Sequence, residues 1–389
     1  GDFTSAGLSA GDKIRATGCA AWSSGVRHHC PATPMNIQHP SWWDPHSDQP
    51  YKLSRQQKPR ITSANLIEFL RTGLSTAVLL PAIAWCYATQ KRHPEPPPIK
   101  EFAGLGISPE RGNPNAIVEL VEELGVKRLL IRVPTWQVEQ LDPYLRFAEL
   151  FQHHRILINI LQDRQHVAEP ERWLNATNRI IDSFSSLTDE FQLGNAINRS
   201  KWGCQNTQDY LNLLDCNVEL KRQYPQIQFA GSSVIDFEPL STLRTLFNFH
   251  QYQLDACSAL LYVNRRGSPY SKQFGLFDLE KKIRILAALV SLSNRCDHKL
   301  WITEVNWPLL NTKPYTPNSG HPRSTVDEDT QAQYLTEYFQ IARQTGLVDR
   351  VYWWQLINPG YGLVDHRGNG LRKMPSFYAF KRLLEPSHS

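Results

Sequence analysis

Eight short apolar runs, separated by segments of helical periodicity, constrain the fold of this chain more than any other feature. The apolar runs lie at 102–107, 128–133, 155–161, 191–195, 228–234, 256–262, 300–304 and 351–357. Segments with apolar residues at i, i+3 and i+4 lie between them, for example at 116–124, 173–184, 209–223, 279–291 and 330–345. Strands that alternate with helices predict a parallel α/β fold, and eight repeats predict a closed (β/α)8 TIM barrel over residues 101–385.

The alternative architecture is an open, doubly wound sheet. No GxGxxG or Walker A sequence follows any of the apolar runs, which weakens that alternative. With 41% hydrophobic and 20% charged residues, the chain has an ordinary globular composition. Its formal charge of +5 is dispersed rather than gathered in aromatic-rich basic patches, so nucleic-acid binding is not expected.

Seven cysteines occur in the chain without a CxxC pair, and no His, Cys or Asp cluster has metal-ligand spacing. Neither a metal nor a cofactor is therefore expected. The cysteines are interpreted as free, mostly buried thiols, with a Cys204–Cys216 disulfide as the alternative in an oxidising compartment.

Residues 1–65 differ from the rest of the chain, because they are rich in Gly, Ser, Pro, His and Gln and show no sustained period. We expect this N-terminal arm to be disordered through about residue 62. A hydrophobic segment follows at 66–90, and then a Pro-rich linker at 91–100 that is typical of an extended spacer.

Within the hydrophobic segment, the run Leu74–Ala88 carries no charge. Its length lies between a signal-peptide core and a spanning helix, and small residues at A-x-A-like spacing occur near its end. The prediction is an anchor-like helix that stands apart from the barrel, with the protein membrane-anchored or exported to the periplasmic side of a bacterial envelope. The alternative is a helix packed on the barrel.

Chemistry in a TIM barrel lies at the carboxyl ends of its strands, so we consider the side chains expected there. They include carboxylates, amides, an arginine and aromatic residues, a combination that suits a polyhydroxylated ligand such as a carbohydrate. The candidate site consists of Glu304 together with the substrate-binding candidates Arg132, Trp136, Asn195, Asn198, Tyr262, Trp307 and Trp353.

Several motifs at these strand ends resemble the clan A glycoside hydrolases, in particular families such as the family 39 β-xylosidases and iduronidases. The most specific is Trp301-Ile-Thr-Glu-Val-Asn-Trp-Pro308, which looks like the nucleophile motif of the seventh barrel strand. The segments 229–233, 254–262, 351–355, 362–365 and 373–378 are similar to strands five, six and eight and to the closing helix. The resemblance implies that Glu304 is the nucleophile of a retaining site.

The chain also departs from that pattern. The fourth strand of the clan normally ends in an Asn-Glu pair whose Glu is the acid/base, whereas here Ala196 follows Asn195. Leu260 stands where the clan usually has His, and Tyr262 is kept. Retaining hydrolysis uses two carboxyl groups, one as nucleophile and one as proton donor, and alanine cannot donate a proton. Restoring Glu at position 196 is therefore expected to raise hydrolysis.

Three functions remain open from the sequence. The first is a retaining hydrolase or transglycosylase that uses Glu304 and a relocated acid, for which Asp163, Asp236 and Glu238 are candidates. The second is a catalytically degenerate barrel that binds glycan and serves polysaccharide assembly at a membrane. The third is a structural barrel, in which Glu304 only pairs with Arg132. The sequence leaves the sugar, the linkage and the oligomeric state open.

Overall fold

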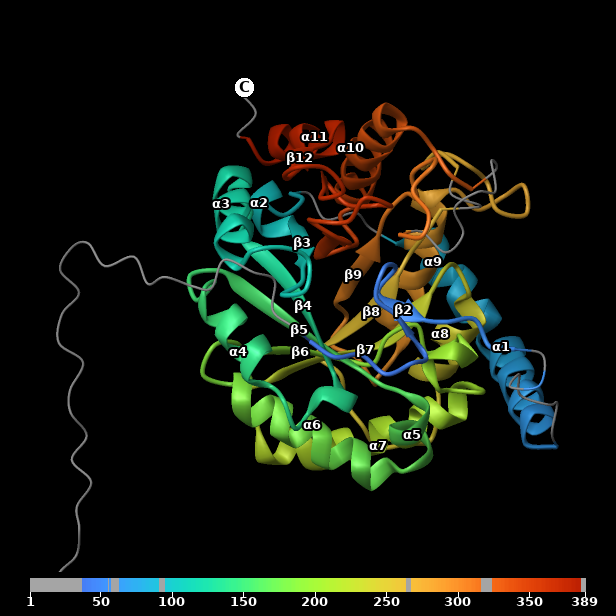
Figure 1. Ribbon diagram of the computed structural model, residues 1–389. Coiled ribbons are helices and arrows are strands. Elements are labelled where there is room, and N and C mark those ends of the chain that lie inside the picture. Colours follow the sequence, from blue (N-terminus) through green and yellow to red (C-terminus); the bar gives the residue numbers. More distant parts are fainter. Residues whose placement is uncertain are drawn as a thin grey trace, which may run out of the picture. The chain divides into compact units, whose positions relative to one another are not determined.

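A closed barrel of eight parallel strands forms the body of the protein (Figure 1). The computed structural model describes residues 37–54, 56, 63–90, 95–263, 267–315 and 324–385. Neighbouring strands around the barrel follow the order β10-β3-β4-β5-β6-β7-β8-β9. Their bounds are Ala103–Ile107 (β3), Arg128–Pro134 (β4), Arg155–Leu161 (β5), Glu190–Leu193 (β6), Gln228–Ile235 (β7), Ala256–Leu260 (β8), Leu300–Val305 (β9) and Arg350–Trp353 (β10). The predicted TIM barrel is confirmed, and closure excludes the open sheet.

Helices follow the strands and form the outer layer of the barrel. The main ones are α3 (Pro114–Leu124), α4 (Asp142–Glu149), α6 (Pro170–Phe184), α7 (Thr207–Gln223), α8 (Pro239–Leu246), α9 (Leu279–Leu292), α10 (Glu328–Gln344) and α11 (Pro375–Leu384). Short elements complete the described chain: α2 (Ile99–Phe102), α5 (Arg164–Ala168), η1 (Thr135–Gln137), η2 (Ser200–Trp202), β11 (Val364–Asp365) and β12 (Arg372–Lys373). Apolar faces of these helices pack on the strands, which are buried on both sides.

Large aromatic rings fill the barrel interior and fix which residues can face it. A Cβ atom on Gly106 would lie 2.3 Å from the Trp354 ring, and one on Gly104 would lie 2.4 Å from the Tyr352 ring. The glycines of β3 therefore make room for aromatic rings from β10 and the residue after it. Trp354 also lines the pocket described below, so this packing positions one wall of the site.

The expected disorder of residues 1–65 is wrong for residues 37–54. Residues 1–36, 55 and 57–62 lie outside the described residues. Two short antiparallel strands, β1 (Trp43–Asp44) and β2 (Gln49–Pro50), form a hairpin with Trp43 opposite Pro50. Figure 1 shows this hairpin across the barrel mouth. Its stability comes from tertiary contacts to the barrel, which composition and periodicity do not reveal.

The hydrophobic segment forms α1 (Ser63–Thr89), and the predicted helix is confirmed, but it does not stand apart from the barrel. In Figure 1 it lies in the outer ring beside α8 and α9. Glu68 pairs with Arg244 of α8 at 2.7 Å, and the Cys86 sulfur lies 3.0 Å from the Ser291 hydroxyl of α9. Glu68 and Cys86 of α1 thus have partners on the barrel, and these contacts hold the helix against it.

Candidate active site at the barrel mouth

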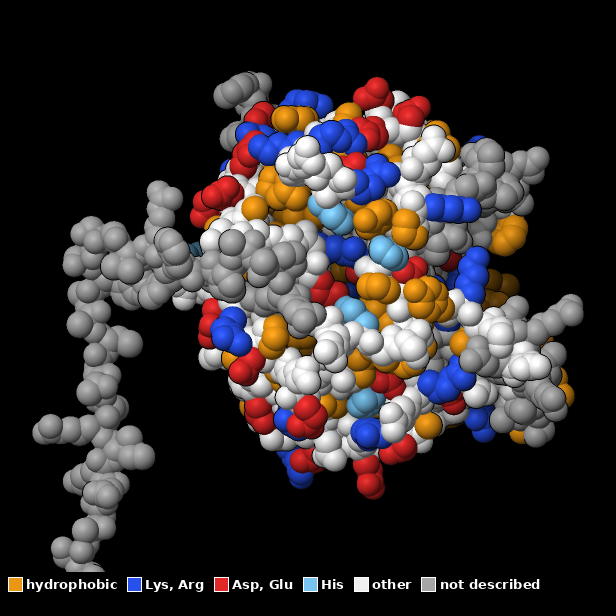
Figure 2. All heavy atoms as spheres, in the orientation of Figure 1, with side chains coloured by type: hydrophobic (Ala, Val, Ile, Leu, Met, Phe, Trp, Pro, Cys, Tyr) orange, Lys and Arg blue, Asp and Glu red, His pale blue; other side chains and the backbone are white. Residues whose placement is uncertain are grey.

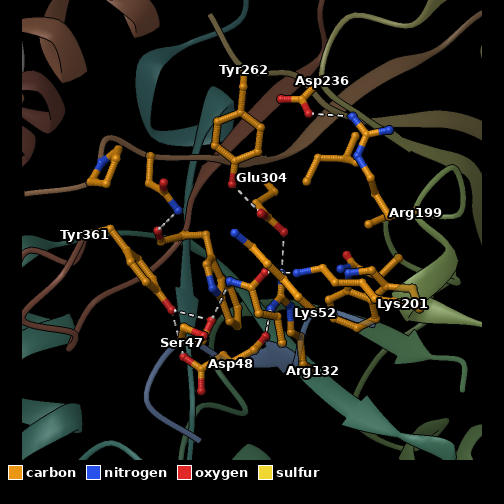
Figure 3. A pocket seen from close by; sticks show the side chains of 18 residues that line it. Ser47, Asp48, Lys52, Arg132, Arg199, Lys201, Asp236, Tyr262, Glu304 and Tyr361 are labelled. Carbon is orange, nitrogen blue, oxygen red and sulfur yellow. Dashed lines mark hydrogen bonds and ion pairs between the residues drawn. The ribbon is translucent and has the colours of Figure 1, made fainter. Parts of the chain in front are cut away.

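A pocket of about 330 Å³ opens at the carboxyl ends of the strands, and Glu304 lies in it (Figure 3). Strand β9 carries Glu304, β4 carries Arg132, and Asn195 and Ala196 follow β6. Tyr262 lies two residues beyond β8 and also lines the pocket. On the face shown in Figure 2, acidic, basic and histidine side chains lie close together near the centre.

Two side chains hold the Glu304 carboxylate in place. The Tyr262 hydroxyl donates to Oε1, and an Arg132 guanidinium nitrogen pairs with Oε2. The Arg132 guanidinium also lies 3.6 Å from the centre of the Trp354 ring, a cation–π contact that fixes its plane. Glu304 is only 8% exposed, so its orientation is set by these partners rather than by water. The carboxylate is thereby aimed at a fixed point in the pocket.

Asn195 also lines the pocket and is held by Asn159 of β5 and by Gln162, the residue that follows β5. Its backbone N–H donates to the Gln162 side chain at 2.8 Å, and its carbonyl accepts from the Gln162 amide at 2.8 Å. The Asn159 amide donates to Asn195 Oδ1 at 3.0 Å. The structure therefore brings together four of the expected residues around one pocket: Glu304, Arg132, Tyr262 and Asn195.

The hairpin of residues 37–54 supplies part of the pocket wall, which the sequence did not predict. Ser47, Asp48, Gln49 and Lys52 all line the pocket. The Asp48 carboxylate pairs with Arg111, and it accepts hydrogen bonds from Gln355 and from the Tyr361 hydroxyl, the latter at 3.1 Å. The one sequence signal was the Trp42–Trp43–Asp44 group inside a Gly-, Pro- and His-rich arm. A disordered segment is usually poor in such aromatic residues.

Replacing Asp48 with Asn tests this anchoring. Asp48 and Arg111 are 5% and 8% exposed, so the variant leaves a buried guanidinium without its charge partner. Asn is suited to the positive φ of 52° at this position, so the backbone is not perturbed. The expected loss of unfolding free energy is about 3–5 kcal/mol, measured by chemical denaturation.

The control for this experiment is Glu139→Gln. Glu139 pairs with Arg179 on the surface, where the two side chains are 74% and 52% exposed. An exposed pair contributes at most about 1 kcal/mol, so this variant should unfold close to wild type. Equal unfolding midpoints for wild type, Asp48→Asn and Glu139→Gln would contradict an anchored hairpin.

Ala196 does not leave the open gap opposite Glu304 that was expected. It lines the edge of the pocket, but its side chain is fully buried. It belongs to an apolar cluster with Trp43 of the hairpin, Trp202 and Tyr262. Ala196 is thus packed against aromatic rings of the hairpin and of η2.

Four other predicted residues lie outside the pocket. Trp307 and Trp353 are fully buried, and their rings stack with centroids 6.1 Å apart, so they are core residues. Successive side chains of a strand point to opposite faces, and it is Trp354 that faces the pocket. Trp136 packs against Trp43 of the hairpin, with their ring centroids 5.1 Å apart. Asn198 donates to the Ile235 carbonyl at 3.0 Å and so joins the loop after β6 to the end of β7.

None of the three carboxylates proposed as substitute acids is free of other partners. Asp163 caps α5 and lies 2.9 Å from the His166 ring nitrogen. Asp236 and Glu238 both pair with Arg199, at 2.7 and 2.6 Å. Of these three, Asp236 alone lines the pocket. The described residues of the pocket therefore offer no unengaged carboxyl in place of the missing glutamate.

Two lysines extend into the same pocket, and the sequence did not single them out (Figure 3). Lys201 of η2 donates to the side chain of Gln49, and Lys52 comes from the hairpin arm. Neither forms an ion pair with any residue that the structure describes. Burial lowers the pKa of Lys201 to about 8, although the nearby Glu304 carboxylate acts in the opposite direction. Lys201 is thus mostly charged at pH 7 and loses its charge within a mildly basic range.

No group of three or more His, Cys, Asp or Glu side chains suited to a metal ion occurs among the described residues. The alternative disulfide is not formed, since Cys204 and Cys216 are both free thiols.

Comparisons with known proteins identify the fold. No protein-family profile and no curated protein sequence matches the chain. Among solved structures, a family 39 glycoside hydrolase from the gut symbiont Bacteroides cellulosilyticus WH2 is similar, with a TM-score of 0.55 and 16% identity over 75% of this chain. An α-L-arabinofuranosidase from Thermotoga maritima in complex with arabinose has a TM-score of 0.54 and 14% identity over 75% of this chain. A β-glucosidase from Exiguobacterium marinum has a TM-score of 0.51 and 11% identity over 74%.

This protein therefore shares its (β/α)8 barrel fold with these three glycoside-hydrolase structures. At these identities the similarity establishes the fold alone. The matches cover 65% of the Bacteroides chain, 71% of the Thermotoga chain and 98% of the Exiguobacterium chain.

Proposed function

We propose that this protein binds a poly- or oligosaccharide at the barrel mouth and that Glu304 serves as the nucleophile of a retaining-type site. The observation that carries the proposal is the Glu304 carboxylate, fixed by Tyr262 and Arg132 at the end of β9 and facing an open pocket. A purely structural ion pair would need neither the tyrosine bond nor a pocket. The structural neighbours named above are glycoside hydrolases, which is consistent with this chemistry.

The proposed reaction is attack of one Glu304 oxygen on the anomeric carbon of a bound sugar. The glycosidic bond breaks with its electron pair on the leaving oxygen, and a glycosyl-enzyme forms. Arg132 and Tyr262 orient the carboxylate for this step. Because no carboxyl opposes Glu304 at position 196, the leaving oxygen must depart without that proton donor. We therefore expect fast reaction with activated leaving groups and slow turnover of ordinary glycosides.

The second candidate is a barrel that binds glycan without cleaving it. The observation that favours it is the aromatic cluster around Ala196, because Trp43 and Trp202 pack against the position of the missing catalytic group. A site under selection for hydrolysis would not be expected to fill that region with apolar rings. In this reading the pocket recognises a saccharide for polysaccharide assembly at a membrane, with α1 as the element that associates with the membrane.

Lys52 and Lys201 favour a saccharide that carries negative charge, such as a carboxylated sugar. The positive charges of the two arginines that line the pocket are already neutralised, because Arg132 pairs with Glu304 and Arg199 pairs with Asp236. Lys52 and Lys201 form no ion pair with any described residue, so a carboxylate on the ligand would neutralise them. An ammonium–carboxylate hydrogen bond is among the stronger polar contacts in a binding site.

The charge of Lys201 makes a pH dependence testable. Its pKa of about 8 means that the pocket loses one positive charge between about pH 7 and pH 9. Affinity for a uronic-acid oligosaccharide, measured by calorimetry, is expected to fall at least about tenfold over that range. In Lys201→Gln the affinity should be low throughout and nearly independent of pH. A wild-type affinity that stays constant or rises toward pH 9 would contradict the assignment.

The nucleophile is tested by trapping the glycosyl-enzyme. Fluorinated glycosides with activated leaving groups form glycosyl-enzymes that break down slowly, so a panel of different sugars is offered to the full chain. Mass spectrometry of the digested protein is expected to find the sugar on the peptide that contains Glu304. If an activated glycoside is hydrolysed while the label appears on another residue, Glu304 is not the nucleophile. If saccharides bind but none labels the protein, the glycan-binding candidate is favoured.

A further inference from the structure

The outer face of α1 is apolar and uncovered. Phe69, Leu70, Leu74, Val78 and Trp85 are each 61–73% exposed. Between Gly73 and Thr89 the helix has no charged residue. An 18-residue window within Asn65–Thr89 has a mean hydropathy of 1.5, and only 6% of that window is buried. A stripe of large exposed side chains at helical spacing is unusual on a soluble surface and marks a contact with another apolar phase.

The inner face of the same helix is fastened to the barrel by polar contacts. The Glu68 carboxylate forms a buried ion pair with Arg244, and both side chains are 7% exposed. Near the other end, Arg284 donates to the Tyr87 carbonyl at 2.8 Å, and its guanidinium lies 4.3 Å from the centre of the Tyr87 ring. A helix pulled away from the barrel to cross a bilayer would leave Arg244 buried without its partner, which is strongly unfavourable.

A groove of about 970 Å³ adjoins the exposed stripe. Leu74 and Val78 of α1 line one side of it, and Phe249, which is 99% exposed, lines the other. Arg71 and Arg295 stand at the same groove. Its loops directly precede β8 and β9, so it lies toward the end of the barrel opposite the Glu304 pocket. Apolar walls beside arginines match a lipid, with its acyl chain against the walls and its phosphate on the guanidinium groups.

We propose that α1 lies along the surface of an anionic phospholipid bilayer, with its outer face and Phe249 inserted into one leaflet and a lipid in the adjoining groove, while its inner face remains on the barrel. The length of α1 would also allow it to span a bilayer, so the buried Glu68–Arg244 pair, rather than length, decides between the two arrangements. The flank of the barrel then rests on the membrane. This inference refines the membrane association proposed above and does not depend on the sugar site.

Vesicle flotation with the full chain tests the surface. Binding to vesicles that contain phosphatidylglycerol is expected, with weaker binding to phosphatidylcholine alone. Leu74→Asp/Trp85→Asp should reduce binding at least about tenfold, because two inserted apolar side chains become charged. Arg71→Gln should reduce binding to the anionic vesicles about fivefold and have little effect on the neutral ones. The matched control is Tyr378→Asp on α11, which is 47% exposed, lies away from α1 and should bind like wild type.

A cross-link distinguishes a helix that lies on the membrane from one that crosses it. Ser291→Cys places a second thiol beside Cys86, where the native sulfur and hydroxyl are 3.0 Å apart, so oxidation joins α1 to α9. The oxidised protein is expected to bind vesicles as well as the reduced protein does. If binding requires reduction, α1 leaves the barrel and the proposal fails, although membrane association itself stands.

Two further outcomes would overturn the proposal. Absence of vesicle binding in both redox states would reject membrane association as well. A stable dimer in lipid-free solution that persists with vesicles, and that Leu74→Asp/Trp85→Asp converts to a monomer, would assign the apolar face to a second copy of the chain. The glycoside-trapping result is independent of each of these outcomes.

Discussion

Glu304→Gln is expected to abolish covalent labelling by activated fluorinated glycosides and to lower the release of their leaving group by about 10³-fold or more. The amide has nearly the shape of the carboxylate and can still bond to Tyr262, but it is a far weaker nucleophile. The pocket should therefore still accept the sugar while the covalent step is lost. Intact-protein mass spectrometry measures the label, and leaving-group absorbance measures the rate.

Glu238→Gln is the matched control for this experiment. Glu238 is a carboxylate at the same rim that pairs with Arg199 and does not line the pocket. Its amide variant is expected to label at the wild-type rate. Thermal unfolding of both variants separates loss of chemistry from loss of fold. Labelling of Glu304→Gln at the wild-type rate would remove Glu304 from the proposed role.

Ala196→Glu is expected to raise the hydrolysis of unactivated glycosides by about 10²–10⁴-fold, because it restores a proton donor on the strand end that lacks one. The backbone at Ala196 already has a positive φ of 47° with a Cβ present, so a longer side chain adds little strain there. The added atoms must displace rings of the cluster that includes Trp43 and Trp202. We therefore also expect about 1–3 kcal/mol lower stability from overpacking.

Ala196→Gln provides the control, because it adds the same bulk without an acid. Both variants should lose similar stability by chemical denaturation, and only the glutamate variant should gain activity. Turnover is measured with the sugar that labels Glu304 or that binds to the pocket. Equal activity of the two variants would show that the missing proton donor is not what limits this site.

The barrel was predictable because its signal is repeated and local. Each strand buries both faces and appears as an apolar run, and each helix shows its own period, so eight weak signals support one another. The strand ends then placed Glu304, Arg132, Asn195 and Tyr262 at one rim, as the structure has them. This part of the site follows from topology alone, since every parallel strand delivers its last residues to the same end of the barrel.

The rest of the site depends on contacts that are distant in the sequence. Asp48 lies in an arm with no periodicity, and its partners Arg111, Gln355 and Tyr361 come from far along the chain. No local pattern encodes such a match. Trp353 was predicted to line the pocket, whereas its neighbour Trp354 does so. This error has a different cause, because a shift of one residue along a strand reverses which side chain faces inward.

The order of elements along the chain gives the hairpin a further consequence. Residues 37–54 precede α1, yet they close a pocket built by strands that follow α1. A cut within α1, at the small residues near Ala84 or Ala88, would sever the part of the chain that holds Ser47, Asp48 and Lys52. The hairpin would then be held by its side-chain contacts alone, and its departure would remove the ion-pair partner of Arg111 and uncover the region beside Ala196. Release of the hairpin after such a cut would therefore change the lining of the Glu304 pocket without any change in the barrel itself.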